Sequence, residues 1–301
     1  MLSSMCHRIH WFAAVFIGSV LANVADAGII AGFDSSRHSR FQSDGSNNSE
    51  FFLDHTQLTG VARQRAVLIS PRHYISADHV SVSSATFIGL DGVERTYTAS
   101  SSQTLLTNVP EEGWVGSDIR VYRLDEEVDA SIRPLPIIVG SAEAIIGREL
   151  IAFDQNEYAG RNVIDDLGIV EFSSGSGDSV AIQFSYDTAT NGGSGGLGAD
   201  EIGLLSGDSG GTALMSVDGD YGVIGAHMGI DVPTGSSASA GDRYDSFSTV
   251  LAAYQGQLSG ILASDGYQLM TLQVTAIPEP SVAAALGFGV LAITYRRRRS
   301  S

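Results

Sequence analysis

Residues 205–214 read LSGDSGGTAL, a glycine-rich loop that leads into an apolar run. Because glycine permits backbone angles that other residues avoid, such a loop can direct the N–H groups of Gly207 and Ser209 toward one point, as in an oxyanion hole. A serine hydroxyl is a poor nucleophile at neutral pH. It needs a base, a group that orients this base, and donors for the oxyanion. If Ser209 is a nucleophile, its base and the orienting group must lie elsewhere in the chain.

The candidate base is a histidine. His79 ends residues 67–79, VLISPRHYISADH, in which two short strand-like segments lead into small residues. This order predicts that the ring of His79 lies where a strand ends and a loop begins. We expect His73 to be a solvated turn residue, whereas His38 and His55 lie in polar segments without such a context.

The candidate orienting acid is Asp118, since such an acid should be buried close to the base. Asp118 opens an alternating stretch, residues 119–124 (IRVYRL), that is typical of a strand. It lies 39 residues after His79 and 91 residues before Ser209.

Three stretches, LISPRHYISADHV, SDIRVYRL and SGDSGGTAL, occur in this order and resemble the active-site motifs of trypsin-like (chymotrypsin-fold) serine proteases. The resemblance covers most of residues 29–262. It implies that His79 is the base, that Asp118 orients it, and that Ser209 attacks the carbonyl of a protein or peptide substrate. It also implies an oxyanion hole formed by the N–H groups of Gly207 and Ser209, and no cofactor or metal.

The resemblance extends to substrate binding and activation. It implies a substrate pocket with Gly203 near its base. His227 is similar to a histidine that contacts acidic side chains of the substrate in bacterial glutamyl endopeptidases. The alternative is that His227 is hydrogen-bonded within the wall of the pocket. Residues 29–32 (IIAG) resemble the family's activated N-terminus, whose amine inserts beside the aspartate before the nucleophile, here Asp208. Ile29 would therefore be the activation partner of Asp208 once Gly28 is removed, unless this stretch simply begins a strand.

The strand pattern gives an independent indication of the fold. Short apolar runs alternate with polar turns and predict strands at 66–70, 74–76, 84–88, 119–124, 150–153, 169–172, 180–186 and 221–227. Such a pattern favours an all-β sandwich or barrel. Residues 248–262 are the best helix candidate. The resemblance implies two antiparallel six-stranded β-barrels, which we expect at 28–132 and 133–262, the second with a C-terminal helix, followed by a linker at 263–276.

Both ends of the chain look like targeting segments. Residues 1–27 combine basic residues, an apolar run and the cleavage pattern Ala25-Asp26-Ala27, as a secretory signal peptide does. Residues 277–301 run from Pro-Glu-Pro through a short apolar stretch to four arginines and resemble the PEP-CTERM sorting signal of Gram-negative bacteria. They imply processing by signal peptidase and an exosortase, transient membrane attachment, and delivery to the cell surface or extracellular matrix; a plain membrane anchor is the alternative.

Composition limits the partners. The formal charge is −17 and all 17 basic residues are arginines, which argues against binding nucleic acid. The single cysteine, Cys6, lies in the expected signal peptide.

Where the family commonly has Ala before the base, this chain has Asp78, which could face solvent or act on His79. An esterase of the α/β-hydrolase class would need alternating helices and a different order of catalytic residues. A non-catalytic binding module of the matrix is the second hypothesis.

Overall fold

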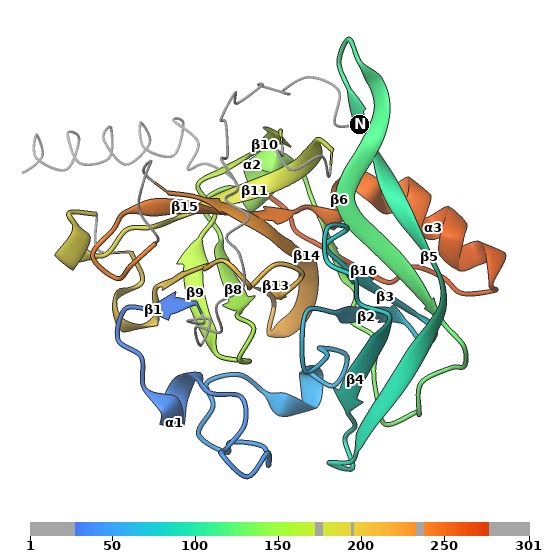
Figure 1. The fold of residues 1–301 in the computed structure, drawn as a ribbon, viewed down its shortest axis with the longest axis horizontal. Coiled ribbons are helices and arrows are strands. Elements are labelled where there is room, and N and C mark those ends of the chain that lie inside the picture. Colours follow the sequence, from blue (N-terminus) through green and yellow to red (C-terminus); the bar gives the residue numbers. More distant parts are fainter. Residues whose placement is uncertain (1–27, 172–176, 194–195, 233–237, 277–301) are drawn as a thin grey trace, which may run out of the picture.

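The computed structural model describes residues 28–171, 177–193, 196–232 and 238–276. Most of them form β-strands, arranged in two large sheets that lie next to each other (Figure 1). The predicted targeting segments, 1–27 and 277–301, lie outside the described residues. No helix in the described ranges has the length and apolar character needed to cross a membrane.

The first sheet has five antiparallel strands in the order β2-β3-β6-β5-β4. Their bounds are β2 (Val67–Ser70), β3 (His73–Ser76), β4 (Ser84–Ile88), β5 (Glu94–Val109) and β6 (Gly113–Leu124). The β5–β6 hairpin is long and extends beyond the rest of the sheet (Figure 1).

The second sheet has nine strands and follows the order β10-β11-β15-β14-β13-β8-β9; β7 pairs with β14, and β16 pairs with β7. Their bounds are β7 (Ile137–Val139), β8 (Glu149–Phe153), β9 (Ala159–Val163), β10 (Asp166–Val170), β11 (Ser179–Tyr186), β13 (Thr212–Val217), β14 (Asp220–Asp231), β15 (Tyr244–Thr249) and β16 (Thr271–Gln273). Two short strands, β1 (Ile29–Ile30) and β12 (Ile202–Gly203), pair separately.

The helices are short. The α-helices are α1 (Ser35–His38), α2 (Ala142–Ile145) and α3 (Gln255–Ser264), and the 3-10 helices are η1 (His55–Gln57), η2 (Ala189–Asn191), η3 (Gly198–Asp200) and η4 (Leu251–Tyr254). Helix α3 lies beside β5 (Figure 1), and the side-chain amide of Gln257 bonds both the N–H and the carbonyl of Leu106 on that strand.

Strand alternation explains how the two sheets share a core. Successive side chains of a strand point to opposite faces, and both faces of β2 and β3 are buried. Leu68 and Tyr74 enter a cluster confined to the first sheet and the segments that cover it. Ile69 and Ile75 point the other way, into a cluster that also contains Leu214 from the second sheet, together with residues of η4 and α3. This shared core fixes the relative position of the strands that carry the candidate site.

The all-β prediction with a C-terminal helix is confirmed, and the structure refines its details. The two sheets have five and nine strands where six each were expected. The expected linker 263–276 contains β16, which pairs with β7. His73 is not a solvated turn residue: it lies on β3 and is fully buried, with Nδ1 2.8 Å from the Ser70 hydroxyl and Nε2 3.0 Å from the Asp265 carboxylate.

Candidate active site

Strand pairing brings His79 to Asp118. β3 pairs with β6 so that Ser76 lies opposite Arg120. The chain therefore leaves β3 next to the part of β6 that carries Asp118. The Nδ1 atom of His79 lies 2.8 Å from each carboxylate oxygen of Asp118, and the N–H of His79 donates to the same carboxylate at 2.9 Å.

The surroundings of this pair suit a base and its orienting acid. Asp118 is fully buried, whereas the side chain of His79 is 24% exposed. Burial raises the pKa of the Asp118 carboxyl, and its hydrogen bonds with His79 act in the opposite direction. Because an ionised carboxylate only accepts hydrogen bonds, we assign the proton to Nδ1 of His79, which leaves Nε2 as an acceptor. The Ser179 hydroxyl accepts from the N–H of Asp118 at 2.7 Å and ties this position to the second sheet.

Ser209 lies in the tight loop between β12 and β13. Gly207 and Gly210 have φ angles of 115° and 81°, in the region that favours glycine. The neighbouring amides are bonded within the protein: Asp208 donates to Leu205, while the N–H of Gly210 donates to the carbonyl of His227 on β14. These bonds hold the loop against the second sheet.

The amides of Gly207 and Ser209 differ from those of their neighbours. Within the part of the chain that the structure describes, neither N–H donates to a protein acceptor, whereas those of Asp208, Gly210 and Gly211 all do. Gly207 and Ser209 are partly exposed, so a substrate can reach their N–H groups. Two donors without a protein acceptor beside a serine hydroxyl are an arrangement that an anionic oxygen could complete.

The serine loop packs against the chain that leads to His79. A Cβ added at Gly210 would lie 2.5 Å from the Ser76 hydroxyl, so only glycine permits this approach. Among the described residues, the structure records no hydrogen bond between Ser209 and His79. In unliganded active sites the bond between nucleophile and base is often long and tightens only when substrate binds.

Asp208 lies beneath the serine loop and is 1% exposed. It accepts hydrogen bonds from the N–H groups of Leu205 (2.6 Å), Gln155 (3.0 Å) and Gly28. Burial raises its pKa to about 6 despite these bonds. In the chain that retains Gly28, the neighbour of Asp208 is Gly28, and the expectation that Ile29 pairs with Asp208 after removal of Gly28 stays a prediction. Gly28 contacts Asp208, whereas Ile29 belongs to β1 and pairs with Gly203.

A second buried carboxylate, that of Asp154, lies beside Gly28 and close to Asp208. Asp154 follows β8 and is 4% exposed, and its Cβ lies 3.1 Å from the position that a Cβ on Gly28 would take. Its Oδ1 accepts from the N–H groups of Asn156 (2.8 Å) and Tyr158 (2.9 Å), but its Oδ2 has no partner in the described structure. Burial and the charge of Asp208 raise the pKa of Asp154 to about 8. Sequence reasoning missed this residue, although its position directly after an apolar strand is a signal that could have found it.

The two expected pocket residues do not border open space. A Cβ on Gly203 would lie 2.3 Å from the Tyr244 hydroxyl and 2.7 Å from the Tyr186 side chain. His227 is fully buried; its Nδ1 lies 2.8 Å from the Ser248 hydroxyl and its Nε2 lies 3.0 Å from the Phe153 carbonyl. Burial lowers its pKa to about 3. Because both ring nitrogens are occupied, His227 matches the alternative reading of a neutral histidine hydrogen-bonded within the wall.

The carboxylate of Asp78 has its own partners, although its charge also contributes to the raised pKa of Asp118. Its carboxylate pairs with Arg120 at 2.7 Å and accepts from the Thr104 hydroxyl. An aspartate at this position is thus accommodated by partners on β5 and β6.

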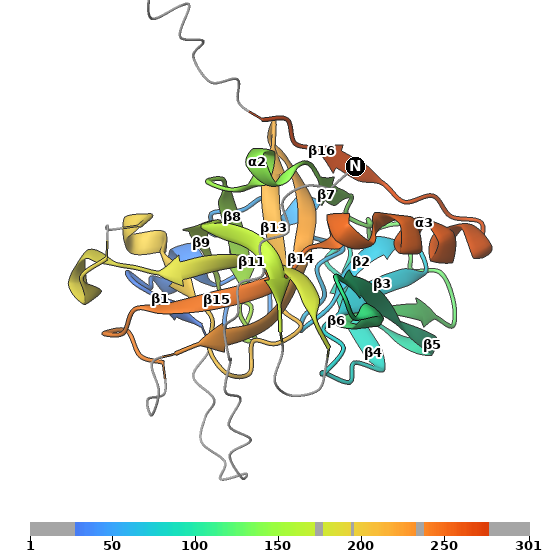
Figure 2. The ribbon, with the colours of Figure 1, turned by 90° about the horizontal axis from the view of Figure 1, so that it is seen from above.

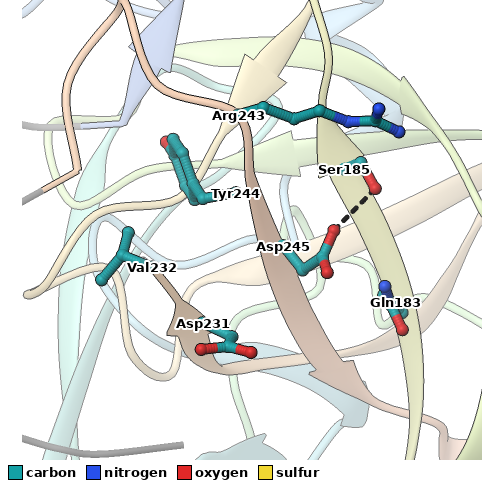
Figure 3. A pocket seen from close by; sticks show the side chains of 7 residues that line it. All are labelled: Gln183, Ser185, Asp231, Val232, Arg243, Tyr244 and Asp245. Atoms are coloured by element: carbon teal, nitrogen blue, oxygen red, sulfur yellow. Dashed lines mark hydrogen bonds between the residues drawn. The ribbon is translucent and has the colours of Figure 1, made fainter. Parts of the chain in front are cut away.

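A polar pocket of about 500 Å³ lies on β11, β14 and β15 (Figure 3). Asp231 and Asp245 lie directly opposite each other on paired strands, and the Ser185 hydroxyl donates to Asp245 at 2.7 Å. Neither Gly203 nor His227 lines this pocket. Arginine and tyrosine side chains, Arg243 and Tyr244, complete its rim (Figure 3).

Comparison with known proteins gives similarity at the level of structure. No protein-family model matches the chain, and no curated protein matches it. The chain is similar to the NS6 protease from murine norovirus 1, with 15% identity, a TM-score of 0.40, and coverage of 65% of this chain and 92% of that one. An inactive mutant of the Murine Norovirus NS6 protease gives 15% identity, a TM-score of 0.38, and coverage of 64% and 98%. Kallikrein-related peptidase 10 gives 15% identity, a TM-score of 0.40, and coverage of 66% and 88%.

Proposed function

We propose that the protein is an exported serine endopeptidase. The observation that carries this proposal is the combination of a buried Asp118 bonded to His79 with two unpaired N–H groups at Gly207 and Ser209 in the described structure. Each of these groups has one of the tasks that serine-based acyl transfer requires, and the resemblance of the three motifs to trypsin-like proteases supports the same assignment.

The chemistry follows from these positions. Nε2 of His79 takes the proton of the Ser209 hydroxyl as its oxygen attacks a peptide carbonyl. The N–H groups of Gly207 and Ser209 stabilise the oxyanion, and Asp118 stabilises the imidazolium that forms. His79 then protonates the leaving amine, and water releases the acyl group from Ser209 by the reverse sequence of proton transfers.

We further propose that export and activation are coupled. Cleavage by signal peptidase after Ala27 would convert the N–H of Gly28 into an ammonium group beside Asp208 and the unpaired oxygen of Asp154. A buried charge needs a partner of opposite sign, so this ammonium would stabilise both carboxylates and thereby the serine loop. Removal of Gly28 would be unnecessary. The motifs of residues 277–301 support later processing by an exosortase at the cell surface.

A fluorophosphonate probe tests the enzyme assignment on the processed protein. We expect covalent labelling at Ser209 that is lost in Ser209→Ala and is slowed in His79→Ala, together with cleavage of a peptide library. A folded, correctly processed protein that is neither labelled nor active on peptides would favour the non-catalytic matrix module. Turnover of acyl esters without peptide cleavage would favour an esterase.

A further inference from the structure

A second cavity, of about 650 Å³, lies between the N-terminal segment and the second sheet, away from the candidate active site. Its walls come from α1, β8 and β9, and from β13 and β14 near the turn that joins them. The nucleophile loop precedes the start of β13, whereas Met215 and Ser216 line the cavity near the other end of that strand. Its volume is in the usual range for ligand sites.

Positive charge collects in this cavity although the chain is acidic overall. Three arginines line it, namely Arg37, Arg148 and Arg161. The buried Asp200 pairs with Arg37 at 2.6 Å and with Arg161 at 2.7 Å, so one carboxylate serves two guanidinium groups. The exposed Glu149 pairs with Arg161 at 3.0 Å. Three positive charges thus face two negative ones in a chain whose formal charge is −17.

Arg148 is the arginine of this cavity without a carboxylate partner among the described residues. Its Nε donates to the carbonyl of Ala144 at 3.3 Å and its Nη2 donates to the carbonyl of Thr275 at 3.0 Å. Its Nη1 makes no hydrogen bond there. Because a guanidinium group presents a planar set of donors that matches a carboxylate, Arg148 is suited to bind one more acid.

The rest of the lining is apolar or aromatic. Phe52, Ile151, Met215 and Tyr221 contribute to the walls, and the guanidinium carbon of Arg37 lies 5.1 Å from the centre of the Phe52 ring. The cavity is therefore complementary to a ligand that combines a carboxylate with apolar groups.

We propose that the occupant is residues 277–280 of the same chain, Ile-Pro-Glu-Pro. The bond from Arg148 to Thr275 places the departing chain at the edge of the cavity, where β16 ends near α2 (Figure 2). Glu279 follows Thr275 by four residues, which span at most ~14 Å when extended. The segment supplies one carboxylate, one branched apolar side chain and two proline rings. Prolines restrict the unbound chain, so less conformational entropy is lost on docking.

Docking would fix the direction in which the following residues leave the body. This docking does not depend on catalysis, since neither the cavity nor the segment contains a proposed catalytic residue. It assigns Arg148 and Glu279 as the pair that holds the segment in place.

Cross-linking in the full chain tests the proposal. In a Cys6→Ser background, Ser216→Cys places a thiol on the cavity lining and Ser281→Cys places one just after the segment. The matched control combines Ser281→Cys with Ser264→Cys, an exposed position at the end of α3. A short bis-maleimide is added before the tail is processed, and linked peptides are quantified by mass spectrometry.

We expect the 216–281 link to exceed the 264–281 link at least fivefold, and to fall to the control level in Glu279→Gln and in Arg148→Met. Glu279 lies outside the described body, so its variant separates loss of docking from loss of folding; thermal unfolding checks the Arg148 variant. Equal linking at the two positions overturns the proposal, as does linking that is insensitive to both charge removals.

Discussion

The N–H of Gly28 donates a hydrogen bond to the carboxylate of Asp208, the residue directly before Ser209. The chain end that the proposed signal cleavage would create thus lies beneath the loop that carries Ser209, the proposed nucleophile. The unpaired Oδ2 of Asp154 at the same place adds a second negative partner for an ammonium group. A charge on the amine of Gly28 would therefore act on the loop that holds Ser209 through the two buried carboxylates of Asp154 and Asp208.

The first prediction concerns the N-terminus. A chain that begins at Gly28 should be active, whereas the same chain with Ala27 retained should lose at least about tenfold in kcat/KM. Removing one partner of a buried ion pair costs ~3–5 kcal/mol, which exceeds the ~1.4 kcal/mol of a tenfold change. The rate of fluorophosphonate labelling provides an independent readout. Asp208→Asn should reduce activity in the chain that begins at Gly28. Equal activity of the two chains would contradict the coupling.

The second prediction concerns pH. Without an ammonium at Gly28, the folded-state pKa is raised to about 8 for Asp154 and to about 6 for Asp208, from 3.8 in both cases. A carboxyl whose pKa is raised by folding holds its proton longer in the folded state, so stability is lost as pH rises from about 4 through these values. Urea unfolding of an N-acetylated chain should therefore show falling stability between pH 4 and pH 8.

Two variants separate the causes of that slope. Asp154→Asn should flatten it in the acetylated chain, and the chain with a free Gly28 amine should show a smaller slope because the ammonium lowers both carboxyl pKa values. If Asp154→Asn leaves the slope unchanged, Asp154 is not the titrating group.

The third prediction separates two acids near His79. Asp118→Asn should lower kcat by about 10⁴-fold, since the amide favours the wrong tautomer of the base. Asp78→Asn is the matched control: Asp78 is bonded to Arg120 and Thr104, so kcat should change only a few-fold. Steady-state kinetics on one peptide substrate compares them. A loss of similar size in both variants would show that the orienting role is not specific to Asp118.

The fourth prediction concerns His227. Its two ring nitrogens are bonded to Ser248 and Phe153 inside the wall. His227→Leu should lower the free energy of unfolding by about 1–3 kcal/mol, the cost of leaving buried groups unpaired, without changing which residue is preferred at the cleavage site. Peptide-library profiling and urea unfolding measure the two effects. A changed cleavage preference would restore the role in substrate binding.

The fifth prediction concerns a buried ion pair that anchors the N-terminal segment. Arg40 and Glu157 are 2% and 7% exposed, and Arg40 also donates to the carbonyls of Leu58 and Val61. Arg40→Met should destabilise the fold by about 3 kcal/mol, the lower part of the range for breaking a buried pair, because Glu157 would keep only the longer contact with Arg63, at 3.7 Å. Arg95→Met, at an exposed pair with Asp91, should have little effect on thermal unfolding. Similar losses in the two variants would argue against a special role of burial.

Local sequence carried most of the information about the strands and the site motifs. The apolar stretches at 67–70 and 73–76 became two strands because branched and aromatic residues surround a short turn. The helix expected at 248–262 ends within two residues of that prediction but begins only at Gln255, because β15 continues to Thr249 and a 3-10 turn follows it. The positions of His79, Asp118 and Ser209 were chosen because each was expected where a strand begins or ends. His79 follows β3 and Ser209 precedes β13, but Asp118 lies within β6, which begins five residues earlier than the pattern indicated.

Other features depended on contacts between distant residues. Nothing near His73 indicates that Asp265, far along the chain, will lie beside it. The burial of His227 depends on Ser248 and Phe153, which come from different strands. Asp154 was not singled out because its significance depends on Gly28 and Asp208, which only the folded chain brings to it.

The sequence by itself determined the β-rich class, the order of the three motifs and the residues available for chemistry, since these depend on side-chain type and on spacing within a few residues. The tertiary structure alone decided which residue contacts Asp208, which histidines are buried, and which arginine of the second cavity lacks an acid among the described residues. Those outcomes follow from strand register and packing between the two sheets, where a shift of one residue exchanges a buried side chain for an exposed one.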